Sequence, residues 1–405
     1  MAKGPYPETT HWTELVSSRK RSACGSGIAA QAKMLIGVPK EIKVLEYRVG
    51  LTPDSVREFV THGHKVVVET QAGAGIGRSD DDYRAAGAEI AGDAKDVFAR
   101  ADMIVKVKEP QASERRMLRK DQILFTYLHL APDPDQCRDL VASGATCIAY
   151  ETVTDGQGGL PLLAPMSQVA GRLSVQAGAH CLERANGGKG ILLGGVPGVA
   201  PAKVVVIGGG VVGGNAIAMA LGMGADVTVL DRNVDALRRL VHIFGTGLRT
   251  VYSTRAALEE YVLSADLVIG AVLVVGAEAP KLVTAGMVKR MQPGSVLVDV
   301  AIDQGGCFET SRATTHAEPT YVVDGVVHYC VANMPGAVPR TSTYALNNVT
   351  LPYALALAGK GARKALLDNP NFREGLNVHQ GKVTYKAVAR DLGYDFVEPE
   401  QALAN

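Results

Sequence analysis

The segment Lys203-Val-Val-Val-Ile-Gly-Gly-Gly-Val-Val-Gly-Gly-Asn-Ala216 indicates the fold most directly, because a run of apolar residues leads into a glycine-rich turn. Gly208, Gly210 and Gly213 match the G-x-G-x-x-G pattern of a strand, turn and helix that bind a dinucleotide. Gly208 would allow the tight turn, Gly210 would let the backbone approach a pyrophosphate, and Gly213 would let the helix pack against the strand. The free N–H groups at the start of the helix would attract the phosphate charge.

An acid ends the next expected strand. Asp226-Val-Thr-Val-Leu-Asp231 follows the expected helix, and Asp231 lies roughly 20 residues beyond the turn, the spacing of a ribose-binding acid. A carboxylate there accepts a hydrogen bond from the ribose 2′-hydroxyl and repels a 2′-phosphate, so the pattern predicts NAD(H) rather than NADP(H). The alternative, a glycine-rich turn in some other α/β protein, does not explain the position of the acid.

Composition limits the kinds of protein that the chain can be. Its 405 residues exceed the length at which a single core usually stops growing, so two domains are expected. Lys plus Arg (42) nearly balance Asp plus Glu (41), which argues against nucleic acid as a partner. The six cysteines form no C-x-x-C pair, so neither a zinc site nor a disulfide framework is predicted, and a reducing cytoplasm fits best.

Two segments could be mistaken for a membrane span or a signal peptide. Residues 191–230 are apolar, but charged residues, glycines and prolines interrupt them, so a continuous span of ~20 apolar residues is missing and no membrane association is predicted. Residues 1–33 lack the apolar run of a signal peptide and lack apolar periodicity. We interpret them as a disordered N-terminal extension or the result of a mis-set start codon, with domain-like sequence beginning at Met34.

From Met34 onward, short β-rich runs alternate with helical patterns, and the alternation recurs after Lys203. This predicts an α/β fold with two Rossmann-like, doubly wound parallel sheets. Small and apolar residues at helical spacing predict long connecting helices over 167–185 and 342–358. The first domain is expected to alternate strands and helices over residues 35–38, 55–62, 65–69, 93–99, 103–107 and 122–127.

The expected domains follow from this order. A substrate domain would comprise residues 34–166 and 335–405, and a nucleotide-binding domain residues 167–334. A cleft between them would hold the cofactor on one side and the substrate on the other, which excludes water during hydride transfer.

Polar residues that follow expected strands are the candidates for chemistry, because ligands bind there in open α/β sheets. Arg48 lies in a turn, where its two-pronged donor set could grip a carboxylate. Lys108 and His129 end two expected strands, Asp303 follows another, and Asn333 and Met334 follow a strand expected over Tyr329–Ala332. Each residue taken singly is more often a solvated or capping group. Together with a nucleotide fold they suit reversible oxidation of a small amino or hydroxy acid.

The motifs in this order resemble those of the alanine dehydrogenase family, which also includes the first domain of proton-pumping nicotinamide nucleotide transhydrogenases. The resemblance covers Met34 to Ala402. It is carried by Gly37–Ile42, Glu46–Gly50, Val105–Pro110, Leu128–Pro132, Pro165–Ser167, Val300–Gly306 and Asn333–Gly336. The transhydrogenase relatives lack histidine at the position of His129, so its presence favours the dehydrogenase.

The resemblance implies a role for each matching residue. Arg48 and Lys108 would bind the carboxylate and carbonyl of L-alanine or pyruvate, and His129 and Asp303 would handle protons while water adds to an iminium and ammonium leaves. No metal is required. The implied cofactor-binding set comprises Ser167, Gly208, Gly210, Val211, Val212, Gly213, Asp231, Ser253, Val272, Leu273, Val300, Asp303, Val331, Asn333 and Met334.

The chain departs from the family pattern at two positions. Ala236 stands where a basic residue is frequent, so Arg232, Arg238 or Arg239 would substitute for it. Val275 stands where a proline is usual. The family forms hexamers or dimers, so a homo-oligomer is expected. Two alternative functions stay open: hydride exchange between nucleotides, and a redox sensor that binds NAD(H) without catalysis.

Overall fold

The computed structural model describes residues 33–272 and 279–404. Of the extension expected over residues 1–33, all but Lys33 lies outside the described residues. Leu273 and Val275 also lie outside them.

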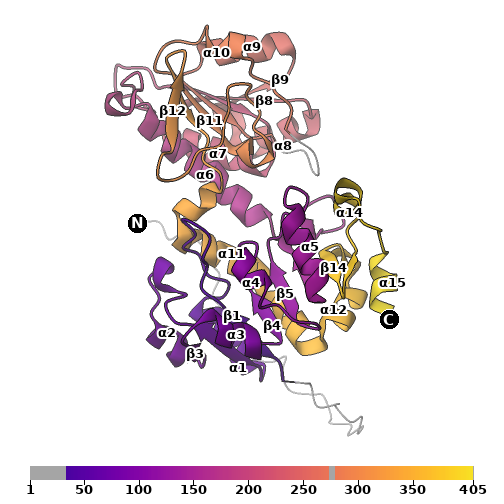
Figure 1. Ribbon diagram of the computed structural model, residues 1–405. Helices are drawn as coiled ribbons and strands as arrows, with labels where there is room; N and C mark the ends of the chain where they lie inside the picture. The colour runs from indigo at the N-terminus through magenta and orange to yellow at the C-terminus, as the bar shows by residue number, and fades with distance from the viewer. Residues whose placement is uncertain (1–32, 273–278, 405) are drawn as a thin grey trace, which may run out of the picture. The chain divides into compact units, whose positions relative to one another are not determined.

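Two separate sheets, each flanked by helices, make up the described chain (Figure 1). The first sheet has eight strands in the order β15-β14-β6-β5-β4-β1-β2-β3, and all its pairs from β6 to β3 are parallel. Its strands are β1 (Leu35–Val38), β2 (Lys65–Glu69), β3 (Glu89–Ala91), β4 (Met103–Val105), β5 (Ile123–Thr126), β6 (Thr146–Ala149), β14 (Leu376–His379) and β15 (Lys382–Val383).

The second sheet has seven strands in the order β12-β13-β11-β10-β7-β8-β9, and only the pair β12 and β13 is antiparallel. Its strands are β7 (Lys203–Ile207), β8 (Asp226–Asp231), β9 (Leu248–Tyr252), β10 (Leu267–Gly270), β11 (Val296–Asp299), β12 (Thr320–Val323) and β13 (Val326–Tyr329). The predicted α/β class with two parallel-dominated sheets is therefore confirmed.

Helices follow most strands, as expected where parallel strands need crossover connections. In the first part of the chain they are α1 (Pro53–Thr61), α2 (Asp80–Ala85), α3 (Ala94–Arg100), α4 (Ala112–Arg115) and α5 (Pro134–Ser143). Around the second sheet they are α7 (Val211–Gly222), α8 (Val234–Phe244), α9 (Arg255–Ser264) and α10 (Ala285–Val288). The C-terminal part adds α12 (Ala362–Asp368), α13 (Pro370–Arg373), α14 (Lys386–Leu392) and α15 (Pro399–Ala404).

Two long helices lie where connecting helices were expected. They are α6 (Ala164–Cys181) and α11 (Pro339–Lys360), and each begins three residues before its expected start. In both, a proline occupies the first turn, where its missing N–H costs nothing. Helix α6 packs on both α7 and α11. Gly171 permits the close approach to α7, because a Cβ atom there would lie 2.2 Å from the Val212 carbonyl oxygen.

Three strands end earlier than the sequence predicted. Strand β4 ends at Val105 and β5 at Thr126, so Lys108 and His129 lie in the loops beyond the strands. The prediction of a strand over Tyr329–Ala332 was wrong, because β13 ends at Tyr329. Asn333 then adopts a left-handed backbone with φ of 61°, which a strand cannot accommodate.

None of the helices in the described ranges is long and apolar enough to cross a membrane.

Candidate functional site

The turn between β7 and α7 has the geometry that its glycines predicted. Gly208 has a φ of +103°, a conformation that favours glycine. A Cβ atom on Gly213 would lie 1.8 Å from the Gly208 carbonyl oxygen, so only glycine lets the helix approach the strand so closely. A Cβ atom on Gly210 would meet no atom within 4 Å. The backbone at Gly210 therefore faces open space, where a ligand can approach it.

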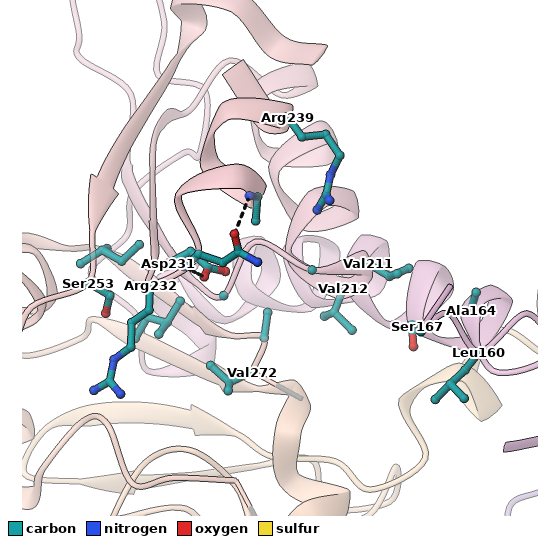
Figure 2. Close-up of a pocket in the computed structure, with 18 of the residues that line it drawn as sticks. Leu160, Ala164, Ser167, Val211, Val212, Asp231, Arg232, Arg239, Ser253 and Val272 are labelled. Carbon is teal, nitrogen blue, oxygen red and sulfur yellow. Dashed lines mark hydrogen bonds between the residues drawn. The ribbon is translucent and has the colours of Figure 1, made fainter. Parts of the chain in front are cut away.

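This open space belongs to a cavity of about 550 Å³. The cavity lies at the carboxyl ends of β7 and β8 and extends to the first turn of α6 (Figure 2). It brings together much of the predicted cofactor-binding set, namely Ser167, Gly208, Gly210, Val211, Val212, Asp231, Ser253 and Val272. Gly213 is buried beneath the turn, and Val300, Asp303, Val331, Asn333 and Met334 do not line this cavity.

Asp231 ends β8 with its carboxylate directed at the glycine turn. Oδ2 accepts the N–H of Gly209 at 2.5 Å, and Oδ1 accepts the N–H of Asn233 at 2.7 Å. These two bonds hold the carboxylate at the cavity wall. Each carboxylate oxygen can accept a further hydrogen bond, so Asp231 can still receive one from a ribose hydroxyl.

The three arginines near Ala236 have different surroundings. Arg232 and Arg239 line the cavity together with Ala236 (Figure 2). Arg239 donates to the carbonyl of Gly209 in the glycine turn at 3.3 Å. Arg238 does not line the cavity and forms an ion pair with Asp235. Of the three arginines, Arg232 and Arg239 therefore lie at the cavity.

A second group of polar residues surrounds Arg48, which is 2% exposed. Its Nε and Nη2 donate to the two carboxylate oxygens of Glu46 at 2.6 and 2.5 Å, and Nη2 also donates to Asn333 Oδ1 at 2.8 Å. The two-pronged face of the guanidinium is thus occupied by Glu46. Nη1 donates to Met166 Sδ at 3.1 Å and has one hydrogen left for another acceptor.

Arg48 also perturbs Glu46. Burial alone would raise the pKa of Glu46, but the hydrogen bonds and charge of Arg48 outweigh burial and lower this pKa to about 2. The pair therefore carries no net charge near neutral pH. Asn333 completes the group, since its Nδ2 donates to Glu46 Oε2 at 3.1 Å and its backbone N–H to Asp303 Oδ1 at 3.3 Å. Arg48 and Asp303 are connected through Asn333.

His129 has an unusual backbone for a non-glycine residue, with φ of 48°. Its N–H donates to Glu151 Oε1 at 2.6 Å, and its ring Nδ1 lies 3.8 Å from the same oxygen. The ring stacks on the buried Tyr127, with centroids 5.8 Å apart and planes 3° apart. With 45% of its side chain exposed, His129 is held on one side and accessible on the other.

Lys108 lies two residues beyond a fully buried lysine, Lys106. Its Nζ lies 3.7 Å from Glu109 Oε2, and its side chain is 12% exposed. Its backbone is held at both ends, because its N–H donates to Glu41 Oε1 at 3.3 Å and its carbonyl accepts from Thr126 Oγ1 at 2.9 Å.

Sequence reasoning missed several residues of these groups. Glu46 and Glu151 contact Arg48 and His129, and Glu41 contacts the backbone of Lys108. For Glu46 a signal existed, because it lies two residues before Arg48. Glu41 and Glu151 gave no such signal, since each is more than 20 residues from its partner. Gly158–Leu160, which line the cavity from the loop before α6, were also missed.

Comparison with known proteins gives consistent matches along the chain. Residues 37–170 match the family "Alanine dehydrogenase/PNT, N-terminal domain", and residues 174–386 match "Alanine dehydrogenase/PNT, C-terminal domain". The chain is 64% identical to the alanine dehydrogenase of Halomonas elongata over 90% of this chain and 98% of that protein. It is 59% identical to the alanine dehydrogenase of Bacillus subtilis over 91% of this chain and 98% of that protein.

Solved structures agree with these matches. A structure of an L-alanine dehydrogenase that is 55% identical covers 89% of this chain and 99% of its own, with a TM-score of 0.87. A transhydrogenase from Sinorhizobium meliloti is 26% identical and covers 86% of this chain and 100% of its own, with a TM-score of 0.76.

Proposed function

The chain belongs to the alanine dehydrogenase/PNT family, and from this premise we propose that it catalyses the reversible oxidative deamination of L-alanine to pyruvate and ammonium with NAD as the cofactor. The observation that carries the proposal is its 64% identity to an alanine dehydrogenase over nearly the full length of that protein. Relatives at this level of identity make the chain an oxidoreductase of the amino-acid dehydrogenase type.

The family uses a nicotinamide cofactor, and the cavity at the glycine turn fits one. Gly210 leaves its backbone open to a pyrophosphate, and the N–H groups at the start of α7 favour its negative charge. The choice of NAD rests on Asp231, whose carboxylate would repel a 2′-phosphate. A bound nicotinamide would supply the hydride acceptor for the oxidation of the alanine Cα. We propose that Val300, Asp303, Val331, Asn333 and Met334, which do not line this cavity, contact the nicotinamide end.

The chain's own residues would bind the substrate and move protons. Nη1 of Arg48 would bind the substrate carboxylate, and the ammonium of Lys108 would polarise the carbonyl oxygen. His129, with its exposed ring face, would take a proton from the water that adds to the imine carbon and return one in the reverse direction. Asp303 would orient that water, since Asn333 binds both Asp303 and Arg48 and so keeps the Asp303 carboxylate near the guanidinium.

Several finer features belong to the same proposal. The substrate domain would comprise residues 34–166 and 335–405 and the NAD domain residues 167–334, a division supported by the membership of the two sheets. A homo-oligomer, hexamer or dimer, is supported by three exposed apolar side chains close in sequence, Leu192, Val196 and Val199. A cytoplasmic location is supported by the five free cysteines of the described chain, which are all buried.

The test is NADH oxidation followed by its absorbance, with pyruvate plus ammonium as substrates. Turnover that requires both substrates and falls strongly with NADPH is the expected result. Parallel reactions with glyoxylate plus ammonium measure selectivity, which a pocket for one methyl group limits to about 1–3 kcal/mol. Tight NADH binding without turnover on any oxo acid would contradict the proposal. Hydride exchange between two nucleotides in that case would indicate a transhydrogenase-like activity, and its absence a redox sensor.

A further inference from the structure

A cluster of three buried charged residues lies beside the loop that carries Lys108. Lys106 is fully buried, and its ammonium donates to Glu41 Oε2 at 3.0 Å and to Glu114 Oε1 at 2.7 Å. Glu41 and Glu114 are 6% and 1% exposed. The residues come from three separate places in the first sheet region, namely the segment after β1, the position directly after β4, and α4 (Figure 1).

Burial of such a cluster is not explained by stability. Removing charges from water costs several kcal/mol per ion, and replacing a buried ionic triad with apolar residues is often neutral or stabilising. Two carboxylates and one ammonium also leave the cluster with a formal net charge of −1. The burial of these three charges therefore has another cause, and the remaining hydrogen bonds of Glu41 and Glu114 indicate it.

Those hydrogen bonds lead to the backbone of the Lys108 loop. Glu41 Oε1 accepts the N–H of Val107 at 2.7 Å and the N–H of Lys108 at 3.3 Å, while its other oxygen binds Lys106. Glu114 Oε2 accepts the N–H of Gln111 at 2.7 Å, at the far end of the same loop. The cluster therefore holds the loop on both sides of Lys108.

We propose that Glu41, Lys106 and Glu114 are positioning residues that fix the Lys108 loop and thereby place the Lys108 ammonium on the substrate. The proposal rests on the substrate-binding role given to Lys108 above. Groups that bind a substrate must be held within fractions of an ångström, and supporting residues provide this precision. A displacement of about 1 Å can cost roughly 10²-fold in rate.

The test compares Glu41→Gln with the wild-type full-length enzyme. The glutamine keeps the shape of the side chain but removes the charge that holds Lys106, so the loop should shift. The expected result is a rise of roughly 10-fold or more in the KM for pyruvate, with the Kd for NADH, measured by fluorescence, changed by less than about twofold. Asp102→Asn is the control, because Asp102 accepts the Leu35 N–H at the opposite end of β4. It should leave both constants unchanged.

A double variant distinguishes a positioning role of Glu41 from a general loss of native structure. In a Lys108→Met background, Glu41→Gln should raise the KM for pyruvate by less than about twofold further, because it acts through Lys108. Equal effects in both backgrounds would overturn the proposal. If Lys108→Met itself leaves the KM unchanged, the substrate-binding role of Lys108 fails instead. Should Glu41→Gln fail to fold, Glu114→Gln tests the same cluster, and an unchanged KM there would also overturn the proposal.

Discussion

Gly213 lies so close to Gly208 that an added Cβ atom would be 1.8 Å from the Gly208 carbonyl oxygen. Because that neighbour is backbone, neither partner can move aside without displacing β7 or α7. We expect Gly213→Ala to lower the free energy of unfolding by about 1–3 kcal/mol or more, as overpacking does, and to weaken NADH binding. Thermal denaturation and fluorescence titration measure the two effects.

Gly222→Ala is the matched control on the same helix. A Cβ atom at Gly222 would meet nothing within 4 Å, so this change should be neutral or stabilise by up to about 1 kcal/mol. Similar losses for the two variants would show that the close approach at Gly213 is not the cause.

Asp231 should discriminate between the two nicotinamide cofactors. Asp231→Asn removes the negative charge and keeps one oxygen, which can accept from the N–H of either Gly209 or Asn233. We expect the ratio of the Kd for NADPH to that for NADH to fall by roughly 10-fold, equivalent to ~1.4 kcal/mol. Asp235→Asn, at an exposed residue of α8 outside the cavity, should leave this ratio unchanged. An unchanged ratio for Asp231→Asn would show that the charge of Asp231 does not select between NADH and NADPH.

Replacement of His129 should reduce turnover without weakening NADH binding. His129→Asn is the suitable variant, because asparagine tolerates the left-handed backbone at φ of 48° better than alanine does. The expected loss in kcat is roughly 10²-fold or more, as for removal of a general acid/base. The exposed His62 provides the control, and His62→Asn should keep full activity. An unchanged kcat for His129→Asn would exclude the proton-handling role.

The ion pair of Glu46 and Arg48 should make stability depend on acid pH. The pKa of Glu46 is lowered from 4.5 to about 2, so its contribution is complete above pH 4.5 and is lost as the pH falls toward 2. The shift corresponds to roughly 3 kcal/mol at neutral pH. Glu46→Gln should therefore lower stability at pH 7 by at least about that amount and flatten its dependence on pH between 4.5 and 2. Urea denaturation at several pH values checks this, and an equally steep dependence in the variant would contradict it.

The glycine turn, Asp231 and the alternation of elements could all be predicted because each depends on neighbours close in sequence. Apolar runs, glycines at fixed spacing and an acid at the end of a strand are local patterns, and the backbone geometry they require is local as well. The class of fold and the position of the cavity at the carboxyl ends of β7 and β8 followed from these patterns. The ends of strands were predicted less well, since the extent of a strand depends on its pairing with partner strands that are distant in the sequence.

Local sequence patterns thus specify the two sheets and the nucleotide turn, whereas the partners of the proposed substrate-binding residues depend on the tertiary structure. Glu46 contacts Asn333, which is 287 residues away in the sequence, and Lys106 contacts Glu41, which is 65 residues away. A buried charge needs hydrogen-bond partners or a counterion wherever the fold brings them near, and no local spacing encodes such long-range contacts. For this reason Arg48 and Lys108 could be recognised as candidates from the sequence, but of the residues that hold them only Glu46, two residues before Arg48, left a local signal.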